Sequence, residues 1–272
     1  MSDEPALSDA LFARLSALLF QKTGITLKDY KKYLVVSRLA RFVGPDKDYS
    51  TFEALYQALT VDGDGELTQG FINALTTNFS YFFRDAVHFT VLEQYLRDRA
   101  PKQDYLRLWS AASSTGEEAY TMAITLARYA GPLPSDRRIL ATDISTKVLA
   151  VAEKGVYGAE SAERNLDRLT RATYFDAIES NKIRVKDSIR RMVDFRQLNL
   201  QGNYPFTKLM DVIFLRNVMI YFAQEEKAQI IERMHDHLKP GGLLFIGLSE
   251  SLAGIPHHFR TFRNSTFQKV RP

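Results

Sequence analysis

The stretch SAASSTGEE, residues 110–118, decides how the second part of the chain folds. It follows the apolar run YLRLW and precedes the helical pattern AYTMAITLARYA. A strand, a loop of small residues and a helix form the unit at which nucleotide-type cofactors bind in α/β proteins. The loop has one glycine, Gly116, where the usual phosphate-binding fingerprint has three. It is therefore a candidate cofactor loop of an unusual kind, in which Gly116 would permit a close approach of the backbone.

Outward from this loop, short apolar runs alternate with helical stretches from Pro101 onward. The runs RRILATDI, MDVIFLRN and GGLLFIGLSE share this pattern. It predicts a doubly wound, Rossmann-like α/β domain, in which helices cover both faces of a parallel sheet. Residues 174–198 interrupt the alternation, and their segments KIRV and MVDF predict a small antiparallel β-subdomain.

The first part of the chain has a different texture. From Leu7 to about Arg84 the apolar residues recur at helical spacing, and the first helix is expected to end at Gly24. No segment there predicts a strand. The expected division is an all-helical domain over residues 1–86 and the α/β domain over residues 87–272.

Composition limits the possible partners and chemistry. The net charge of +4 favours an acidic partner, which leaves nucleic acid, a membrane surface or an acidic protein segment. The absence of cysteine excludes thiolate chemistry, and the spacing of the five histidines predicts no metal site. No apolar run approaches the ~20 residues that span a bilayer, and the start MSDEPALSDA is acidic, so we expect a cytoplasmic protein without membrane insertion.

Two acidic residues stand at the end of the loop of residues 110–118. Glu117 and Glu118 begin the next helix, where acids often only complement the helix dipole. Carboxylates beside the loop disfavour an anionic pyrophosphate and favour a positively charged cofactor without phosphate. S-adenosylmethionine, which carries a sulfonium and an ammonium, meets that description.

Polar residues follow the other predicted strands. Asp143 ends LATDIS, where it would accept hydrogen bonds from ribose hydroxyls or cap the next helix. Asn199 would read adenine through its amide, or serve only as a turn residue. In FLRNVMIYF, Arg216, Asn217 and Tyr221 follow a buried strand, where Arg216 requires a carboxylate partner or a ligand.

Four blocks together carry a family resemblance: NALTTNFSYFFRD, WSAASSTGEEAY, ATDIS and LRNVMIYF. In this order and spacing they resemble the chemotaxis receptor methyltransferases of the CheR type, over nearly the whole chain. The resemblance implies a class I methyltransferase domain behind a helical domain. It also implies transfer of a methyl group from S-adenosylmethionine to glutamate carboxylates of chemoreceptors, with S-adenosylhomocysteine as the product.

The resemblance assigns roles residue by residue. Tyr221 falls at the active-site tyrosine of the family. Arg84 and Arg216 would supply planar guanidinium groups to the carboxylate of cofactor or substrate, and which arginine serves which stays open. The substrate carboxylate is already ionised at neutral pH, so no general base is needed. The implied cofactor-binding residues are Asn78, Ser80, Arg84, Glu118, Asp143, Asn199, Leu200, Arg216 and Asn217.

The expected substrate contacts come from the helical domain. Residues 28–43 predict an amphipathic helix with Lys31, Arg38 and Arg41 on one side, opposite Val36, Ala40 and Val43. Such a stripe is often only a solvated face, but here it would guide the glutamate-rich helical methylation region of a chemoreceptor. The 174–198 segment matches the subdomain with which some family members grip a C-terminal pentapeptide. Its turn DAIESN is short and lacks glycine, so we expect no pentapeptide tether.

Two other functions compete with this interpretation. A class I methyltransferase acting on another acidic protein or on nucleic acid is compatible with the charge, although LRNVMIYF has no proline and no stacking platform. A non-catalytic cofactor-sensing protein would be favoured by loss of the cofactor-binding residues, and all of them are present.

Overall fold

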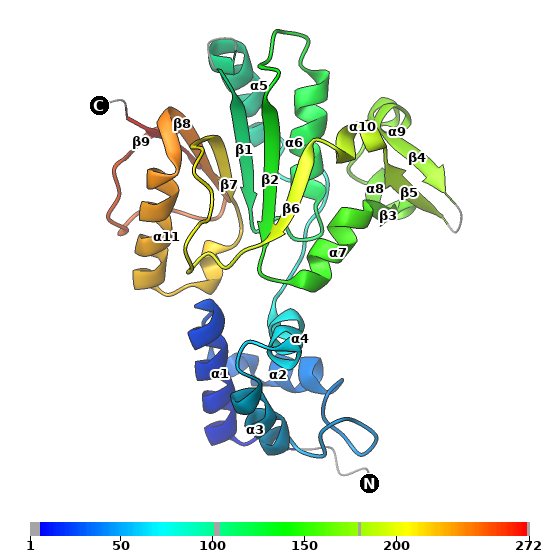
Figure 1. Cartoon of the computed structure of the whole chain (residues 1–272), viewed down its shortest axis with the longest axis vertical. Coiled ribbons are helices and arrows are strands. Elements are labelled where there is room, and N and C mark those ends of the chain that lie inside the picture. The colour runs from blue at the N-terminus through cyan, green and yellow to red at the C-terminus, as the bar shows by residue number, and fades with distance from the viewer. Residues whose placement is uncertain (1–5, 101–103, 179–180, 271–272) are drawn as a thin grey trace.

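The computed structural model describes residues 6–100, 104–178 and 181–270. The first five residues of the acidic start and part of the turn DAIESN lie outside the described residues. Helices α1 to α4 form a bundle below a larger α/β domain in Figure 1. The bundle consists of α1 (Asp9–Thr23), η1 (Asp29–Lys31), α2 (Lys32–Leu39), α3 (Phe52–Asp62) and α4 (Glu66–Leu75).

Helix α1 begins and ends where the sequence predicts. The side chain of Ser8 caps its start by accepting a hydrogen bond from the Leu11 amide, and Gly24 ends it with φ 70°. A Cβ at Gly24 would lie 1.9 Å from the side-chain nitrogen of Gln201, in the α/β domain. The positive φ favours glycine at this helix end, and the absence of a side chain leaves room for Gln201.

The single helix expected over residues 28–43 is wrong. A 3-10 turn precedes α2, which ends at Leu39, so Lys31 and Arg41 both lie outside the helix. Val35 and Leu39 supply its buried face, and Ala40, expected on that face, is exposed. The helical-wheel argument failed because it assumed one continuous helical period across two changes of backbone conformation.

The α/β domain contains a seven-stranded sheet in the order β6-β2-β1-β7-β8-β10-β9. Strands β6, β2, β1, β7 and β8 are parallel, and β10 runs antiparallel to β8 and to β9. The sheet consists of β1 (Leu106–Ala111), β2 (Arg137–Asp143), β6 (Val193–Gln197), β7 (Met210–Leu215), β8 (Leu238–Ile246), β9 (Phe259–Arg263) and β10 (Thr266–Lys269). The β9–β10 hairpin was not predicted.

Both faces of the sheet are buried, as the apolar runs indicate. Leu108 and Phe214 pack with helices α5 and α6 on one face, while Trp109 and Ile213 pack with α11 on the other. The covering helices are α5 (Val87–Arg99), α6 (Glu117–Arg128), α7 (Thr146–Lys154) and α11 (Gln224–Asp236). The doubly wound fold is confirmed.

The small β-subdomain exists, but its predicted strands are partly wrong. KIRV forms β5 (Lys182–Val185), between β4 (Phe175–Ile178) and β3 (Val156–Gly158) in an antiparallel sheet. MVDF belongs to β6 instead, which pairs parallel with β2 at the edge of the main sheet. Alternation alone could not show which sheet a short strand joins. Three short helices complete this region: α8 (Ala159–Glu163), α9 (Arg168–Tyr174) and α10 (Asp187–Arg190).

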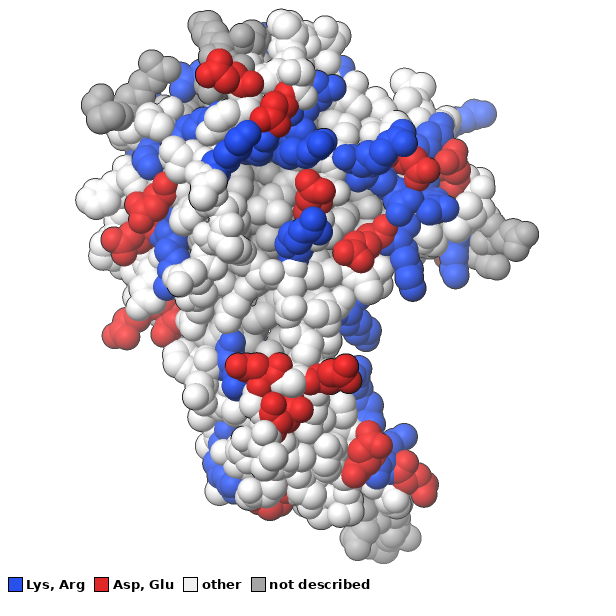
Figure 2. Space-filling view, in the orientation of Figure 1, with Lys and Arg blue, Asp and Glu red and all other residues white. Residues whose placement is uncertain are grey.

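The charges are unevenly spread over the surface. Figure 2 shows lysine and arginine gathered over the β-subdomain, where Arg164, Arg168, Lys182, Arg184 and Arg191 are exposed. The helical domain, where a basic stripe was expected, shows basic and acidic side chains interspersed. Among the described residues, no helix combines the length and apolar character that crossing a bilayer requires.

Candidate active site

A pocket of about 1190 Å³, counting the space open to solvent, lies between the helical domain and the carboxyl ends of the parallel strands. It brings together every predicted cofactor-binding and catalytic residue, and also Lys31. Arg38 and Arg41 do not line it. The predicted residues that line it are Lys31, Asn78, Ser80, Arg84, Glu118, Asp143, Asn199, Leu200, Arg216, Asn217 and Tyr221.

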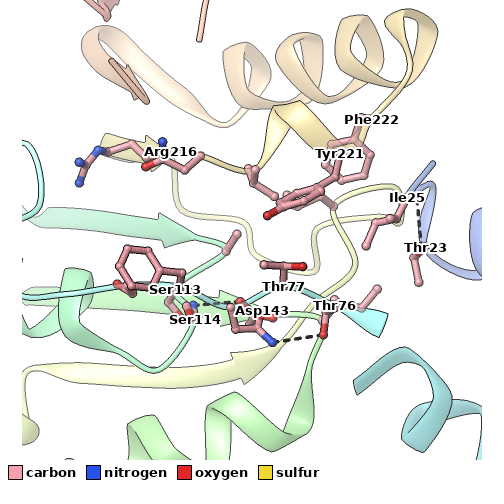
Figure 3. Close-up of a pocket in the computed structure, with 18 of the residues that line it drawn as sticks. Thr23, Ile25, Thr76, Thr77, Ser113, Ser114, Asp143, Arg216, Tyr221 and Phe222 are labelled. Carbon is pink, nitrogen blue, oxygen red and sulfur yellow. Dashed lines mark hydrogen bonds between the residues drawn. The ribbon is translucent and has the colours of Figure 1, made fainter. Parts of the chain in front are cut away.

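The floor of the pocket is the loop after β1, which Asp143 holds in place. One oxygen of the Asp143 carboxylate accepts a hydrogen bond from the Ser114 amide at 2.9 Å (Figure 3). The other oxygen accepts from the Ser145 amide, also at 2.9 Å. Ala112 and Ser114 adopt positive φ values of 79° and 50°, a conformation that needs such fixation. Burial raises the pKa of Asp143, while the two amides oppose that rise. Each oxygen retains a lone pair for a further donor.

Gly116 has a different role from the predicted one. It does not line the pocket, and a Cβ there would lie 2.8 Å from the Cβ of Ala152 in α7. The glycine therefore lets α6 and α7 pack closely behind the loop. Glu117 is also turned away from the pocket, where it is buried and accepts a hydrogen bond from the Thr115 hydroxyl at 2.6 Å. Burial raises the pKa of Glu117. The acids that line the pocket are Glu118 and Asp143.

Arg216 is held by two carboxylates. Its Nη1 donates to Glu118 at 2.8 Å and its Nη2 to Asp85 at 2.6 Å and to the Arg84 carbonyl at 2.7 Å. The side chain is 1% exposed, and Figure 3 shows its guanidinium directed away from Tyr221. The carboxylate partner that burial requires is therefore present within the protein. Both terminal nitrogens already donate to groups of the protein.

Arg84 is placed differently, on the segment that joins the two domains. Its Nη1 donates to the Phe79 carbonyl at 3.0 Å, and its guanidinium lies 5.9 Å and 5.8 Å from the ring centres of Phe79 and Tyr81. No carboxylate pairs with it among the described residues. A planar guanidinium at the pocket wall with donors to spare suits recognition of a carboxylate.

Tyr221 lies where the two domains meet. Its carbonyl accepts a hydrogen bond from the Thr26 amide at 2.9 Å, and Ile25 and Phe222 form an isolated β-bridge beside it. Its hydroxyl points into the cavity in Figure 3, and the Lys31 ammonium lies 5.7 Å from its ring centre. The helical domain therefore supplies both a wall of the pocket and a cation next to the tyrosine.

The other two basic residues of the expected stripe are placed elsewhere. Arg38 donates to the carbonyls of Leu75 and Thr76 and to the Thr77 hydroxyl, so it fixes the end of α4. Arg41 stacks over Phe42 at 4.6 Å. Of the three predicted substrate contacts, the structure brings only Lys31 to the pocket.

The Asn199 side chain does not face the pocket as a free amide. Its nitrogen donates to the Lys22 carbonyl at 2.8 Å, and its oxygen accepts from the Gln201 amide at 3.0 Å. These bonds tie the segment after β6 to the end of α1. The Leu200 amide, next in the chain, has no hydrogen-bond partner among the described residues.

Two residues that shape the site were missed by the sequence interpretation. Asp85 follows Arg84 directly and pairs with Arg216. Glu250 accepts hydrogen bonds from two backbone amides of the loop that carries Tyr221 and from the Gly247 amide after β8. The local patterns FFRD and LSE mark neither acid. Asp85 pairs with Arg216, which is 131 residues away, and Glu250 accepts from Asn217, which is 33 residues away. Each acts through a contact that only the folded chain creates.

Two pocket hydroxyls lack partners. Ser113 Oγ and Ser114 Oγ are buried, and within the described part of the chain neither has a hydrogen-bond partner. Such groups are satisfied by ordered water or by the polar atoms of a ligand. Together with Glu118, Asp143 and a loop without a glycine-rich phosphate cradle, they suit a cofactor that carries hydroxyls and positive charge. No cluster of three potential metal ligands occurs among the described residues. The fold and site therefore define an S-adenosylmethionine-dependent methyltransferase.

Comparison with known proteins narrows this class. Residues 10–76 match the model of the CheR methyltransferase all-alpha domain, and residues 78–268 match that of the CheR methyltransferase SAM binding domain. The chain belongs to the CheR methyltransferase family.

Relatives of known name support this assignment. The chain is 38% identical to the chemotaxis protein methyltransferase of Vibrio anguillarum over 94% of both chains. It is 39% identical to that of Escherichia coli (strain K12) over 98% of this chain and 92% of the relative. Among solved structures, it matches the N-methyltransferase NodS from Bradyrhizobium japonicum WM9 at 14% identity, 71% coverage of both chains and a TM-score of 0.36. The family assignment rests on the sequence relatives.

Proposed function

We propose that the protein transfers the methyl group of S-adenosylmethionine to glutamate side chains in the helical methylation region of chemoreceptors, forming glutamate methyl esters. The observation that carries this proposal is the pocket itself, where Arg84, Tyr221 and Lys31 converge from three segments beside Asp143 and Glu118. Two cations and a hydroxyl in the pocket lining suit an anionic acceptor. The carboxylates in the same lining suit a cationic cofactor.

The cofactor contacts follow from the groups that remain available. Asp143 accepts the ribose hydroxyls through its remaining lone pairs, and the hydroxyls of Ser113 and Ser114 bind polar atoms of the cofactor. Because the Asn199 amide is committed to Lys22 and Gln201, the main-chain amide of Leu200 is the better partner for an adenine nitrogen. When bound, S-adenosylmethionine supplies a methyl group on a positively charged sulfur, and the neutral thioether S-adenosylhomocysteine is released.

The protein contributes mainly position. A glutamate carboxylate with a pKa near ~4.3 is ionised at neutral pH and attacks without a general base. Arg84 binds and orients it, because the Arg216 guanidinium is already occupied by Glu118 and Asp85. The Tyr221 hydroxyl donates a hydrogen bond to one carboxylate oxygen and leaves the other aligned with the methyl group.

The direct test uses radiolabelled S-adenosylmethionine and membranes that contain chemoreceptors. The label should enter the receptor band and be released by mild base, because carboxyl methyl esters hydrolyse readily. Label that resists base would instead support methylation of nucleic acid or of protein nitrogen. Tyr221→Phe should lower kcat at least tenfold, while Tyr105→Phe, at the opposite end of β1, should leave kcat unchanged.

Lys31 provides a test of the substrate side. Lys31→Gln should raise KM for the receptor severalfold at low salt, and the difference from wild type should shrink as salt screens the charge. Arg41→Gln is the matched control, since Arg41 stacks on Phe42 outside the pocket. Equal KM values for Lys31→Gln and wild type at low salt would contradict a substrate role for Lys31.

Two finer points complete the proposal. We place the reaction in the cytoplasm, where the methylation regions of chemoreceptors lie. We also propose that substrate binding needs no C-terminal pentapeptide tether, because the turn DAIESN is short and has no glycine. Micromolar binding of such a pentapeptide in calorimetry would contradict this.

A further inference from the structure

Glu250 holds together the two loops that follow β7 and β8. Its Oε2 accepts hydrogen bonds from the amides of Gly247 at 2.7 Å and Asn217 at 2.8 Å, and its Oε1 accepts from the Met219 amide at 2.9 Å. Hydrogen bonds from amides to an ionised carboxylate are about twice as strong as neutral ones. One side chain therefore fixes three backbone positions.

Those positions determine the path of the chain from Arg216 to Tyr221. Asn217 has φ 57°, a left-handed conformation that asparagine tolerates better than most residues and that reverses the chain here. Met219 begins the 3-10 turn that ends at Tyr221. The carboxylate thus sets both the reversal after β7 and the start of the turn that aims the tyrosine.

The neighbouring glycine shows how closely these loops approach. A Cβ at Gly247 would lie 2.6 Å from the side-chain nitrogen of Asn217 and 2.8 Å from Glu250 Oε2. A larger residue at this position would therefore displace the Asn217 and Glu250 side chains from their present places. At its other end the turn is held by the hydrogen bond from the Thr26 amide to the Tyr221 carbonyl.

We infer that Glu250 is a positioning residue for methyl transfer, which sets the direction of the Tyr221 hydroxyl without touching substrate or cofactor. The inference rests on the proposed role of Tyr221. Glutamine at position 250 would present one acceptor oxygen and an NH₂ group, so at least one of the three amides would lose its partner. A displacement of about 1 Å at a positioned group costs up to ~10²-fold in rate.

The test is a double-mutant cycle on the full chain with Glu250→Gln, Tyr221→Phe and the combined variant. We expect Glu250→Gln to lower kcat at least tenfold while the Kd for S-adenosylhomocysteine, measured by calorimetry, stays within threefold. We further expect Tyr221→Phe to cost much less in the Glu250→Gln background than in wild type. Glu232→Gln, an exposed acid on α11, is the matched control.

Each other outcome contradicts a definite step. A normal kcat for Glu250→Gln, or multiplicative losses in the cycle, would overturn the positioning role. A parallel loss of kcat and of S-adenosylhomocysteine binding would assign Glu250 to overall folding instead. If Tyr221→Phe alone is fully active, the proposed role of Tyr221 fails, and the inference with it. Should Glu250→Gln not fold, Glu250→Asp replaces it in the same cycle.

Discussion

The two ends of strand β7 each carry a buried ion pair, and the pairs serve different purposes. At the amino end, Asp211 is fully buried and pairs with Lys239 at 2.8 Å. At the carboxyl end, Arg216 is almost fully buried and pairs with Glu118 and Asp85. Strand β7 itself, which contains Asp211 and ends one residue before Arg216, is buried throughout.

The partners of each charge explain the difference. Asp211 also accepts the Arg107 amide and the Tyr95 hydroxyl, so its group of partners is closed within the core. The Arg216 cluster instead adjoins the pocket through Glu118 and holds the Arg84 carbonyl. In an open α/β sheet the carboxyl ends of the strands face the ligand and the amino ends do not. A buried charge in this sheet therefore indicates a functional site when it lies at the carboxyl ends of the strands, and not when it lies at their amino ends.

Replacing the basic partner at each end should give the largest effects. Lys239→Met leaves the buried Asp211 carboxylate without its cation, and Arg216→Met leaves the two partly buried carboxylates of Glu118 and Asp85 without theirs. Each change should lower the free energy of unfolding by about 3–5 kcal/mol. Only Arg216→Met should also change the chemistry, because the main chain at Arg84 and the position of Glu118 depend on it. Urea unfolding measures the first effect, and kcat measured where both variants are folded measures the second.

The two variants should differ clearly in kcat. Arg216→Met should lose on the order of 10²-fold in kcat, as expected for a misplaced active-site group, while Lys239→Met should stay within about twofold of wild type. Equal kcat losses in both variants would contradict a functional role that is confined to the carboxyl end of β7.

The fold was predictable where local patterns carry the information. Buried parallel strands are continuous apolar runs, and α1 ends at a glycine, so both follow from short segments. The assignment of MVDF to the β-subdomain failed because pairing with β2 depends on residues about fifty positions away. The helix expected over residues 28–43 failed because the backbone changes conformation at Lys31 and after Leu39.

The sequence predicted which residues lie at the site, but it did not predict which groups their side chains contact. The pocket contains all nine implied cofactor-binding residues, yet the Asn199 amide, the Arg216 guanidinium and Gly116 each contact other parts of the protein. Side-chain direction depends on tertiary packing, and a sequence motif gives only position along a strand end. Asp85 and Glu250 escaped notice for the same reason.

His88 tests how the carboxyl end of β7 responds to acid. Its ring is 1% exposed, packs against Phe214 and Phe245, and has neither nitrogen hydrogen-bonded in the described part of the chain. Burial, reinforced by the Arg216 charge and opposed by Asp85, lowers the pKa of His88 to about 4. The ring therefore stays neutral in the folded protein at pH values where it would bind a proton in the unfolded chain.

The sign of the pH effect follows from this difference. As pH falls from 6.5 to 5, the unfolded state takes up a proton that the folded state does not, so His88 lowers the free energy of unfolding by about 1.5 kcal/mol. Between pH 6.5 and pH 5, the free energy of unfolding of His88→Phe should therefore fall by about 1.5 kcal/mol less than that of wild type. Urea unfolding at each pH measures this difference. His258→Gln, at an exposed position, should follow wild type. Identical pH profiles for His88→Phe and wild type would show that His88 takes up a proton in the folded state.

The smallest predicted effect compares two buried tyrosine hydroxyls. Tyr157, on β3, donates to the Thr115 carbonyl in the cofactor loop at 2.7 Å, and Tyr95, on α5, donates to Asp211 at the amino end at 3.3 Å. Phenylalanine at either position keeps the ring packing and removes about 1 kcal/mol of hydrogen bonding. In Tyr157→Phe this loss should loosen the loop and raise the Kd for S-adenosylhomocysteine about fivefold. In Tyr95→Phe it should lower stability and leave the Kd unchanged, because no cofactor residue depends on Asp211. Calorimetry that finds the same Kd for both variants would show that the β-subdomain does not support the cofactor loop.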